Sequence, residues 1–226
     1  MEINKALIIT ICLLLPFAVA AQPVIAVAAD YEELTDTKPH DGSEVWKKMK
    51  TPVGLEWGSV DMRYPKQNVP QLQGGKVMQL SAWKGERVHA QAVLYTNKNL
   101  DNVRVTAGSL TQGGHTIPAR AVTTHFVRYV MTDGPNRDGS GCGHRENKAE
   151  WDSLLVADVL DIIPARNVKA CTVQPIWVKV NVPADAHPGK YEGMLTAKIS
   201  RISINLMHIP ENMKACSPLR PATCSP

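Results

Sequence analysis

The sequence has 226 residues, and its 25 Lys and Arg against 21 Asp and Glu give a formal net charge of +4. The basic side chains are scattered along the chain instead of gathering in one stripe, which argues against a nucleic acid partner. The length is typical of one large domain, or of one domain with a tail, and excludes two independent enzymatic domains.

The first twenty residues have the order of a secretory leader. Lys5 is their only basic residue, an apolar run follows from 6 to 15, and Ala18-Val19-Ala20 is an A-x-A-like cleavage site. The run is shorter than the roughly 20 residues of a bilayer span, and no later segment resembles a membrane anchor. We expect residues 1–20 to be removed as a signal peptide and the protein to be exported to the periplasm, the cell surface or the medium. An uncleaved N-terminal anchor is the alternative.

Residues 21–44 predict an irregular N-terminal segment. From 30 to 76 the chain is rich in Pro, Gly, Asp and Lys, and Trp46 and Trp57 are isolated large apolar residues. This composition predicts one strand, near 55–60, and no helix.

Apolar and polar residues alternate from residue 87 to 96, which predicts a strand with one buried face. Asn and Asp residues at 97–102 favour a turn, and a long β-branched and aromatic stretch at 119–131 favours a further strand. The Gly-rich stretch 133–145 predicts a surface loop. The apolar residues of 152–161 fit a helix as well as a strand, so their structure stays open.

Two further alternating segments, 176–182 and 191–199, are separated by a Pro- and Gly-containing turn. Short strands at this spacing predict an all-β fold over residues 45–199, an antiparallel β-sandwich with an immunoglobulin-like or jelly-roll-like two-sheet architecture. Residues 200–226 contain four prolines and two cysteines, and we expect them to form an unstructured tail. A shifted reading frame and an ordinary disordered terminus are both open explanations of that tail.

Four cysteines remain after the leader: Cys142, Cys171, Cys216 and Cys224. Export permits disulfides, so pairing of Cys142 with Cys171 is open. Their spacing lacks the CxxC or His-rich pattern of a zinc site, and we expect no metal site and no cofactor.

Several consecutive phrases of this sequence resemble one known domain, the N-terminal β-sandwich of family 123 glycoside hydrolases and their relatives in Bacteroides-type bacteria. They extend over roughly residues 45–199, and they are WKGERVHAQAVL at 83–94, VRYVMTD at 127–133, GCGHR at 141–145, DSLLVADVLD at 152–161 and TVQPIWVKVNVPADAHPGKYEG at 172–193. The last phrase recurs in sandwich domains of several glycosidase families. The five phrases in this order are more specific to the family 123 domain.

The resemblance implies that this chain corresponds to one domain of an enzyme and lacks the domain that carries the catalytic residues. In that family the reaction is hydrolysis of a β-linked N-acetylgalactosamine, assisted by the sugar's own acetamido group, and an Asp-Glu pair on a separate barrel carries it. This chain contains no Asp-Glu step. We therefore expect no catalytic residue here and no enzymatic activity from the chain as it stands.

Four residues are candidates for contact with a glycan or with a partner domain. His144 and Arg145 follow glycines in the 133–145 loop and offer donors to hydroxyls or a carboxylate, although the loop could equally brace a missing barrel or be simply solvated. Trp83 and Trp177 could stack on sugar rings, although a Trp beside a strand more often fills a core or an edge.

Three functions follow from these patterns. The first is a non-catalytic N-terminal domain of a family-123-like glycoside hydrolase, cut short before its catalytic barrel or working with a separate barrel chain. The second is a freestanding secreted glycan-binding module. The third is a structural module whose apolar face docks a partner domain.

Overall fold

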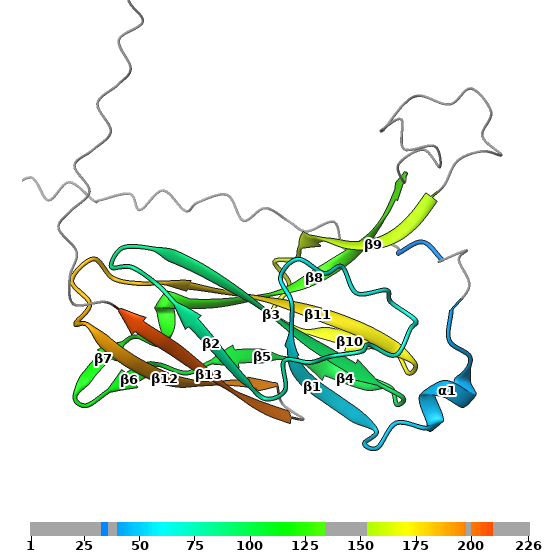
Figure 1. The fold of residues 1–226 in the computed structure, drawn as a ribbon. Helices are drawn as coiled ribbons and strands as arrows, with labels where there is room; N and C mark the ends of the chain where they lie inside the picture. Colours follow the sequence, from blue (N-terminus) through cyan, green and yellow to red (C-terminus); the bar gives the residue numbers. More distant parts are fainter. Residues whose placement is uncertain (1–32, 36–39, 134–152, 198–199, 210–226) are drawn as a thin grey trace, which may run out of the picture. The chain divides into compact units, whose positions relative to one another are not determined.

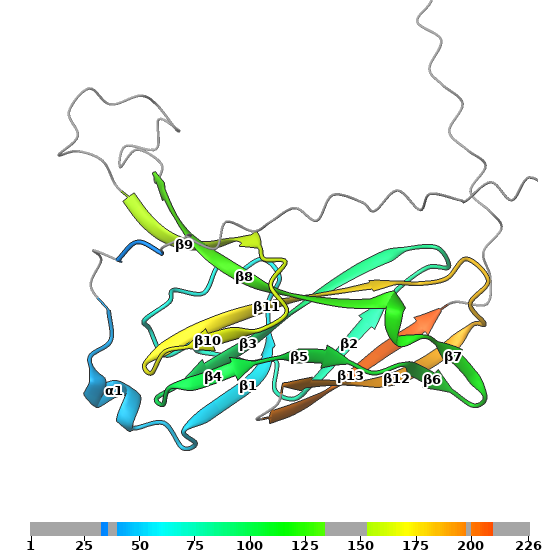
Figure 2. The ribbon, with the colours of Figure 1, turned by 180° about the vertical axis from the view of Figure 1, so that it is seen from behind.

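The computed structural model describes residues 33–35, 40–133, 153–197 and 200–209, and of 200–209 it describes only the backbone. Figures 1 and 2 show the strands from two opposite sides. Their bounds, in chain order, are β1 Val53–Gly58, β2 Val77–Ser81, β3 Arg87–Thr96, β4 Leu100–Val103, β5 Val105–Ala107, β6 Leu110–Gln112, β7 His115–Ile117, β8 Val122–Asp133, β9 Ser153–Leu160, β10 Arg166–Val168, β11 Thr172–Asn181, β12 Gly189–Ala197 and β13 Ser200–Ile209. A short helix, α1 (Ser43–Lys47), precedes β1, and a 3-10 turn (Ala119–Ala121) precedes β8.

Most strands belong to two sheets. The first sheet has the order β1-β3-β11-β8-β9, and every neighbouring pair in it is antiparallel. The second sheet has the order β2-β13-β12-β6-β7, with β5 also paired to β12, and only its β13–β2 pair is parallel. Strands β4 and β10 pair with each other separately.

The two sheets pack face to face, which confirms the predicted all-β sandwich. One cluster of buried apolar side chains joins them: Ala92, Leu94, Ile176 and Val178 come from the first sheet, and Leu110, Ile117, Tyr191 and Leu195 come from the second. Because successive strand residues point to opposite faces, these positions leave the alternate residues of β3 and β11 on the outer face of the first sheet.

Part of that outer face is covered as well. Trp46 of α1 and Tyr64 of the β1–β2 connection pack on Val93 of β3 and Val173 of β11, and Trp46 is fully buried. The Trp46 indole also donates a hydrogen bond to the Gln67 carbonyl oxygen at 3.2 Å. β3 is therefore buried on both sides along much of its length, and its pattern is not a simple alternation.

Three local predictions need comment. The strand predicted at 87–96 is confirmed as β3. The expectation of no helix before residue 76 was wrong, because burial of Trp46 stabilises one helical turn, α1, that has no side-chain cap and too few residues for a periodic pattern. The open segment 152–161 contains a strand, β9, paired along β8.

The predicted end of the fold at residue 199 was also wrong. β13 (Ser200–Ile209) lies between β12 and β2 and pairs with both strands. Its sequence does alternate, since Ile202, Ile204 and Leu206 are separated by Ser203 and Asn205. The expectation of an unstructured tail can hold only for 210–226, which lie outside the described residues, as do the leader 1–20 and most of the 133–145 loop.

Within the described ranges, no helix is long and apolar enough to cross a membrane. Cys171 is partly buried and forms no disulfide with another described residue, and the other cysteines, Cys142 included, lie outside the described residues. The Cys142–Cys171 pairing therefore stays open.

We expect Trp46→Ala to lower the free energy of unfolding by about 3–5 kcal/mol, because the substitution leaves a cavity between α1 and the outer face of the first sheet. Val45→Ala, at an exposed position of the same helix, is the matched control and should change it by less than about 0.5 kcal/mol. Urea unfolding followed by far-UV circular dichroism measures both. Equal effects of the two substitutions would contradict the burial of Trp46.

Candidate docking face around Trp177

Trp177 lies on the outer face of the first sheet, in the middle of its central strand. Its neighbours Ile176 and Val178 point into the core, so the indole points away from it. Across the ladders it is opposite Gln91 of β3 and His125 of β8. Its Nε1 donates a hydrogen bond to His89 Nδ1 at 3.0 Å, and the two ring centroids are 5.5 Å apart. The indole is therefore held in one orientation while it stays partly exposed.

A hollow of about 310 Å³ lies beside this indole, and we call it the Trp177 hollow. Its lining combines sheet residues with residues of the β1–β2 connection and of β9: Val60, Met62, Arg63, Gln91, Val127, Ala157, Asp158, Leu160 and Trp177. The Gln91 amide donates to the carbonyl oxygens of Ser59, at 2.5 Å, and Met62, at 2.9 Å. These two bonds hold the connection against the sheet and so place Val60 and Met62 at the rim.

Large apolar side chains are exposed around the hollow. Met62 is 54% exposed, Leu160 is 45% exposed and Val60 is exposed to a similar degree, and all three line the hollow. Val159 and Ile162, close to Leu160 along the chain, are also exposed but do not line the hollow. Contiguous exposed apolar surface of this kind is typical of a site of contact with another protein, because its removal from water is favourable. We call the side chains of Val60, Met62 and Leu160, together with Trp177, the Trp177 face.

The β9 side of the face is held by a buried carboxylate. Asp161 has a side chain only 2% exposed, and the Arg128 guanidinium donates to its two oxygens at 3.0 and 3.1 Å. Arg166 contacts the same carboxylate at 3.4 Å. Asp161 lies between the exposed Leu160 and Ile162, so these ion pairs fix the backbone that presents both apolar side chains.

The ion pairs continue away from the face. Arg166 also contacts Glu33 at 3.2 Å, and Glu33 pairs with Lys66, whose ammonium lies 5.5 Å from the centroid of the Tyr129 ring. Burial, and after it the positive charges of Arg166 and Lys169, lower the pKa of Lys66 to about 8. This network ties the described residues before α1 to β8 and β10.

Charged and titratable side chains flank the apolar part of the face. Arg63 and Asp158 form an ion pair at 2.9 Å on the lining of the hollow. On β3, partial burial first, and then the charges of Arg87 and Lys179, lower the pKa of His89. A neutral His89 suits the observed geometry, because its Nδ1 must be unprotonated to accept the Trp177 hydrogen bond.

Of the predicted contact residues, only Trp177 lines the hollow. Trp83 is 46% exposed in the turn before β3 and does not line the Trp177 hollow. Its backbone N–H donates to the Glu86 carboxylate at 2.6 Å. His144 and Arg145 lie outside the described residues. The expectations for these residues as contact sites remain predictions.

Sequence reasoning missed Met62 and Leu160 as residues of the face. Met62 carried no signal, because an isolated apolar residue in an irregular segment is common. The sequence Val159-Leu160-Asp161-Ile162 did carry one, since adjacent apolar residues on either side of a charged residue do not suit a half-buried strand. Within the described ranges, no three His, Cys, Asp or Glu side chains gather as metal ligands.

The fold and this face together define the class: an all-β sandwich with an apolar outer patch and no described cluster of catalytic groups at the patch. The chain belongs to the family of glycoside hydrolase 123 N-terminal domains, whose model matches residues 57–199. The resemblance seen in the sequence is thereby confirmed. No curated protein matches the chain.

Comparison with solved structures agrees on the fold. A family 123 glycoside hydrolase from Clostridium perfringens, solved in work on glycolipid glycan hydrolysis, aligns with a TM-score of 0.56 at 17% identity. The alignment covers 70% of this chain and 27% of that chain, so the present chain spans about a quarter of that enzyme.

Two weaker matches carry no argument. The N-terminal domain of PorA aligns at 9% identity with a TM-score of 0.29, over 68% of this chain and 96% of that one. AvmM, which catalyses macrocyclization in alchivemycin A biosynthesis, aligns at 8% identity with a TM-score of 0.32, over 72% and 92%.

We expect Asp161→Asn to lower the free energy of unfolding by about 3–5 kcal/mol, because it removes the buried negative charge that Arg128 and Arg166 both contact. Asp158→Asn is the matched control: its side chain is 49% exposed and its ion pair with Arg63 should contribute no more than about 1 kcal/mol. Denaturant unfolding at neutral pH measures both variants. A neutral effect of Asp161→Asn would show that the buried ion pairs do not hold the β9 side of the face.

Proposed function

We propose that this chain is a non-catalytic accessory domain that presents the Trp177 face to the catalytic domain of a family 123 glycoside hydrolase. The observation that carries the proposal is the group of exposed apolar side chains around the Trp177 hollow, held in place by Gln91 and by the buried Asp161. The catalytic domain would come from another part of the polypeptide or from a separate chain. The leader-like residues 1–20 support an exported location.

The charged groups of the face support a non-catalytic role. Glycoside hydrolysis generally needs two carboxyl groups, about 5–10 Å apart, that both reach the substrate. Among the described residues, Asp158 is the single carboxylate that lines the Trp177 hollow, and it is paired with Arg63. Asp161 is nearby in sequence but buried beneath two arginines.

We expect the purified chain to show no turnover of a chromogenic β-N-acetylgalactosaminide over a wide range of protein concentration. A family 123 hydrolase that includes its catalytic domain is the positive control. Turnover that rises in proportion to the concentration of this chain would contradict the non-catalytic role.

We expect the isolated chain to bind the apolar dye ANS and to self-associate as its concentration rises, because the Trp177 face has no partner to cover it. The double variant Met62→Ser and Leu160→Ser should lower both effects at least about threefold. Met194→Ser is the matched control, since Met194 is 43% exposed on β12, in the other sheet. Sedimentation velocity and dye fluorescence measure the two effects.

Monodisperse behaviour at high concentration, or an equal response to Met194→Ser, would remove the docking face as the basis of the proposal.

A second candidate function is that of a freestanding glycan-binding module. It is favoured by the partly exposed Trp177 indole next to the polar side chains of Gln91, Arg63 and Asp158. Glycan-array binding that Trp177→Ala abolishes would favour this second function over docking.

A further inference from the structure

A second hollow, of about 390 Å³, lies on the same outer face of the first sheet, over β1 and the last residues of β3. We call it the Tyr95 hollow. Its lining combines apolar residues, among them Met49, Val69 and Pro70, with the polar side chains of Lys50, Glu56, Lys76 and Tyr95. A concave site that combines apolar surface with a few convergent polar groups is typical of small-molecule binding.

The Tyr95 ring is placed by a glycine on the neighbouring strand. Gly54 is directly opposite Tyr95 in the β1–β3 ladder, and a Cβ atom added to Gly54 would lie 2.0 Å from Cζ of the ring. The ring therefore lies down over the Gly54 backbone instead of standing upright on the sheet. Any side chain at position 54 would push the ring away. With glycine there, the ring lies flat and forms an aromatic part of the floor of the hollow.

The Tyr95 hydroxyl is fixed as well. It donates a hydrogen bond to the Glu56 carboxylate, and burial together with this bond raises the pKa of Tyr95, so the phenol keeps its proton. The phenol oxygen and the remaining Glu56 lone pairs can still accept hydrogen bonds. Lys50 and Lys76 supply donors, and as two cations against one carboxylate they leave the lining with a charge of +1.

We propose that the Tyr95 hollow binds an acidic pyranose, a sugar ring that carries a carboxylate. The C–H face of such a ring packs on an aromatic side chain, its hydroxyls donate to the Glu56–Tyr95 pair, and its carboxylate pairs with the lysines. A purely apolar ligand would form no hydrogen bond with Glu56 or Tyr95, and a cationic ligand would meet the two ammonium groups. The chemistry of this lining suits a ligand with an apolar face, hydroxyl donors and one negative charge.

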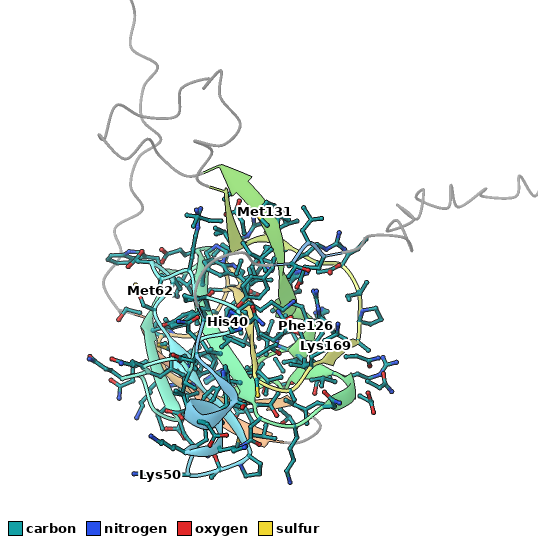
Figure 3. The ribbon with its side chains drawn as sticks, turned by 90° about the vertical axis from the view of Figure 1, so that its right-hand side faces the viewer. His40, Lys50, Met62, Phe126, Met131 and Lys169 are labelled. Carbon is teal, nitrogen blue, oxygen red and sulfur yellow. The ribbon has the colours of Figure 1, made fainter. Side chains whose placement is uncertain are left out.

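This site is separate from the Trp177 face. Tyr95 and Gln91 are four residues apart on β3, about 13 Å along the strand. Trp46 and Tyr64 cover Val93, which lies between them on the same face. Figure 3 shows Lys50, on the lining of the Tyr95 hollow, well separated from Met62, on the lining of the Trp177 hollow. The proposal therefore stands whether or not the Trp177 face docks a catalytic domain.

The test is titration of the chain with methyl β-D-glucuronide and, in parallel, with the neutral methyl β-D-glucoside, followed by ligand-observed saturation-transfer NMR. A ligand of this size should bind the wild-type chain with a Kd of about 1 mM, and the neutral sugar at least about threefold more weakly. Tyr95→Ala should abolish glucuronide binding. Lys76→Gln, at an exposed position that should not disturb folding, should raise the Kd about threefold or more.

Two controls make the result decisive. Lys84→Gln removes an exposed positive charge in the turn before β3 and should leave the Kd unchanged, as should Trp177→Ala. Circular dichroism confirms that each variant is folded. Absence of glucuronide binding, equal binding of the two sugars, or binding that survives Lys76→Gln while Trp177→Ala removes it would overturn the assignment.

Discussion

The antiparallel pairing of β3 with β11 is the contact on which the other features depend. The two strands pair without a register shift from Arg87 opposite Asn181 to Thr96 opposite Thr172. Because side chains alternate along both strands, this single register decides which residues enter the core and which reach the outer face. A slip of one residue would exchange Ile176 and Val178 for Trp177 in the core and would remove both hollows.

The outer face of this pair is used in three ways along its length. At the middle, Val93 and Val173 are covered by Trp46 and Tyr64 and add to the stability of the domain. Toward the start of β3, His89 and Trp177 remain accessible beside exposed apolar side chains. At the end of β3, Tyr95 lies over Gly54 and lines a second hollow. The short covering segments between β1 and β2 and around α1 thus divide one sheet face into two separate surfaces.

Much of the fold could be predicted from the sequence, because regular alternation is local and visible. β3, β11 and β12 were predicted from their alternating apolar residues, and the two-sheet architecture followed from the strand spacing. α1 could not be predicted, since its single turn exists because the tertiary structure buries Trp46. β13 was missed although its isoleucines alternate, because prolines and cysteines further along the chain dominated the composition of that segment.

The candidate site was harder to predict, for a physical reason. An exposed Trp177 follows from strand alternation, but the partners that make it part of a surface come from distant segments. Met62 reaches the hollow through hydrogen bonds from Gln91, and Leu160 does so because Asp161 is anchored by arginines of β8 and β10. Such contacts depend on the folded arrangement, and no pattern of neighbouring residues encodes them.

The most direct test of the docking role is hydrogen–deuterium exchange on this chain, alone and mixed with a family 123 catalytic domain supplied as a separate protein. The account predicts slower exchange in the complex at residues 59–63 and 158–163, which form the rim of the Trp177 face, and no change at β6 and β7 in the other sheet. Unchanged exchange at the rim, or protection confined to β6 and β7, would contradict the claim that the Trp177 face is where a catalytic domain docks.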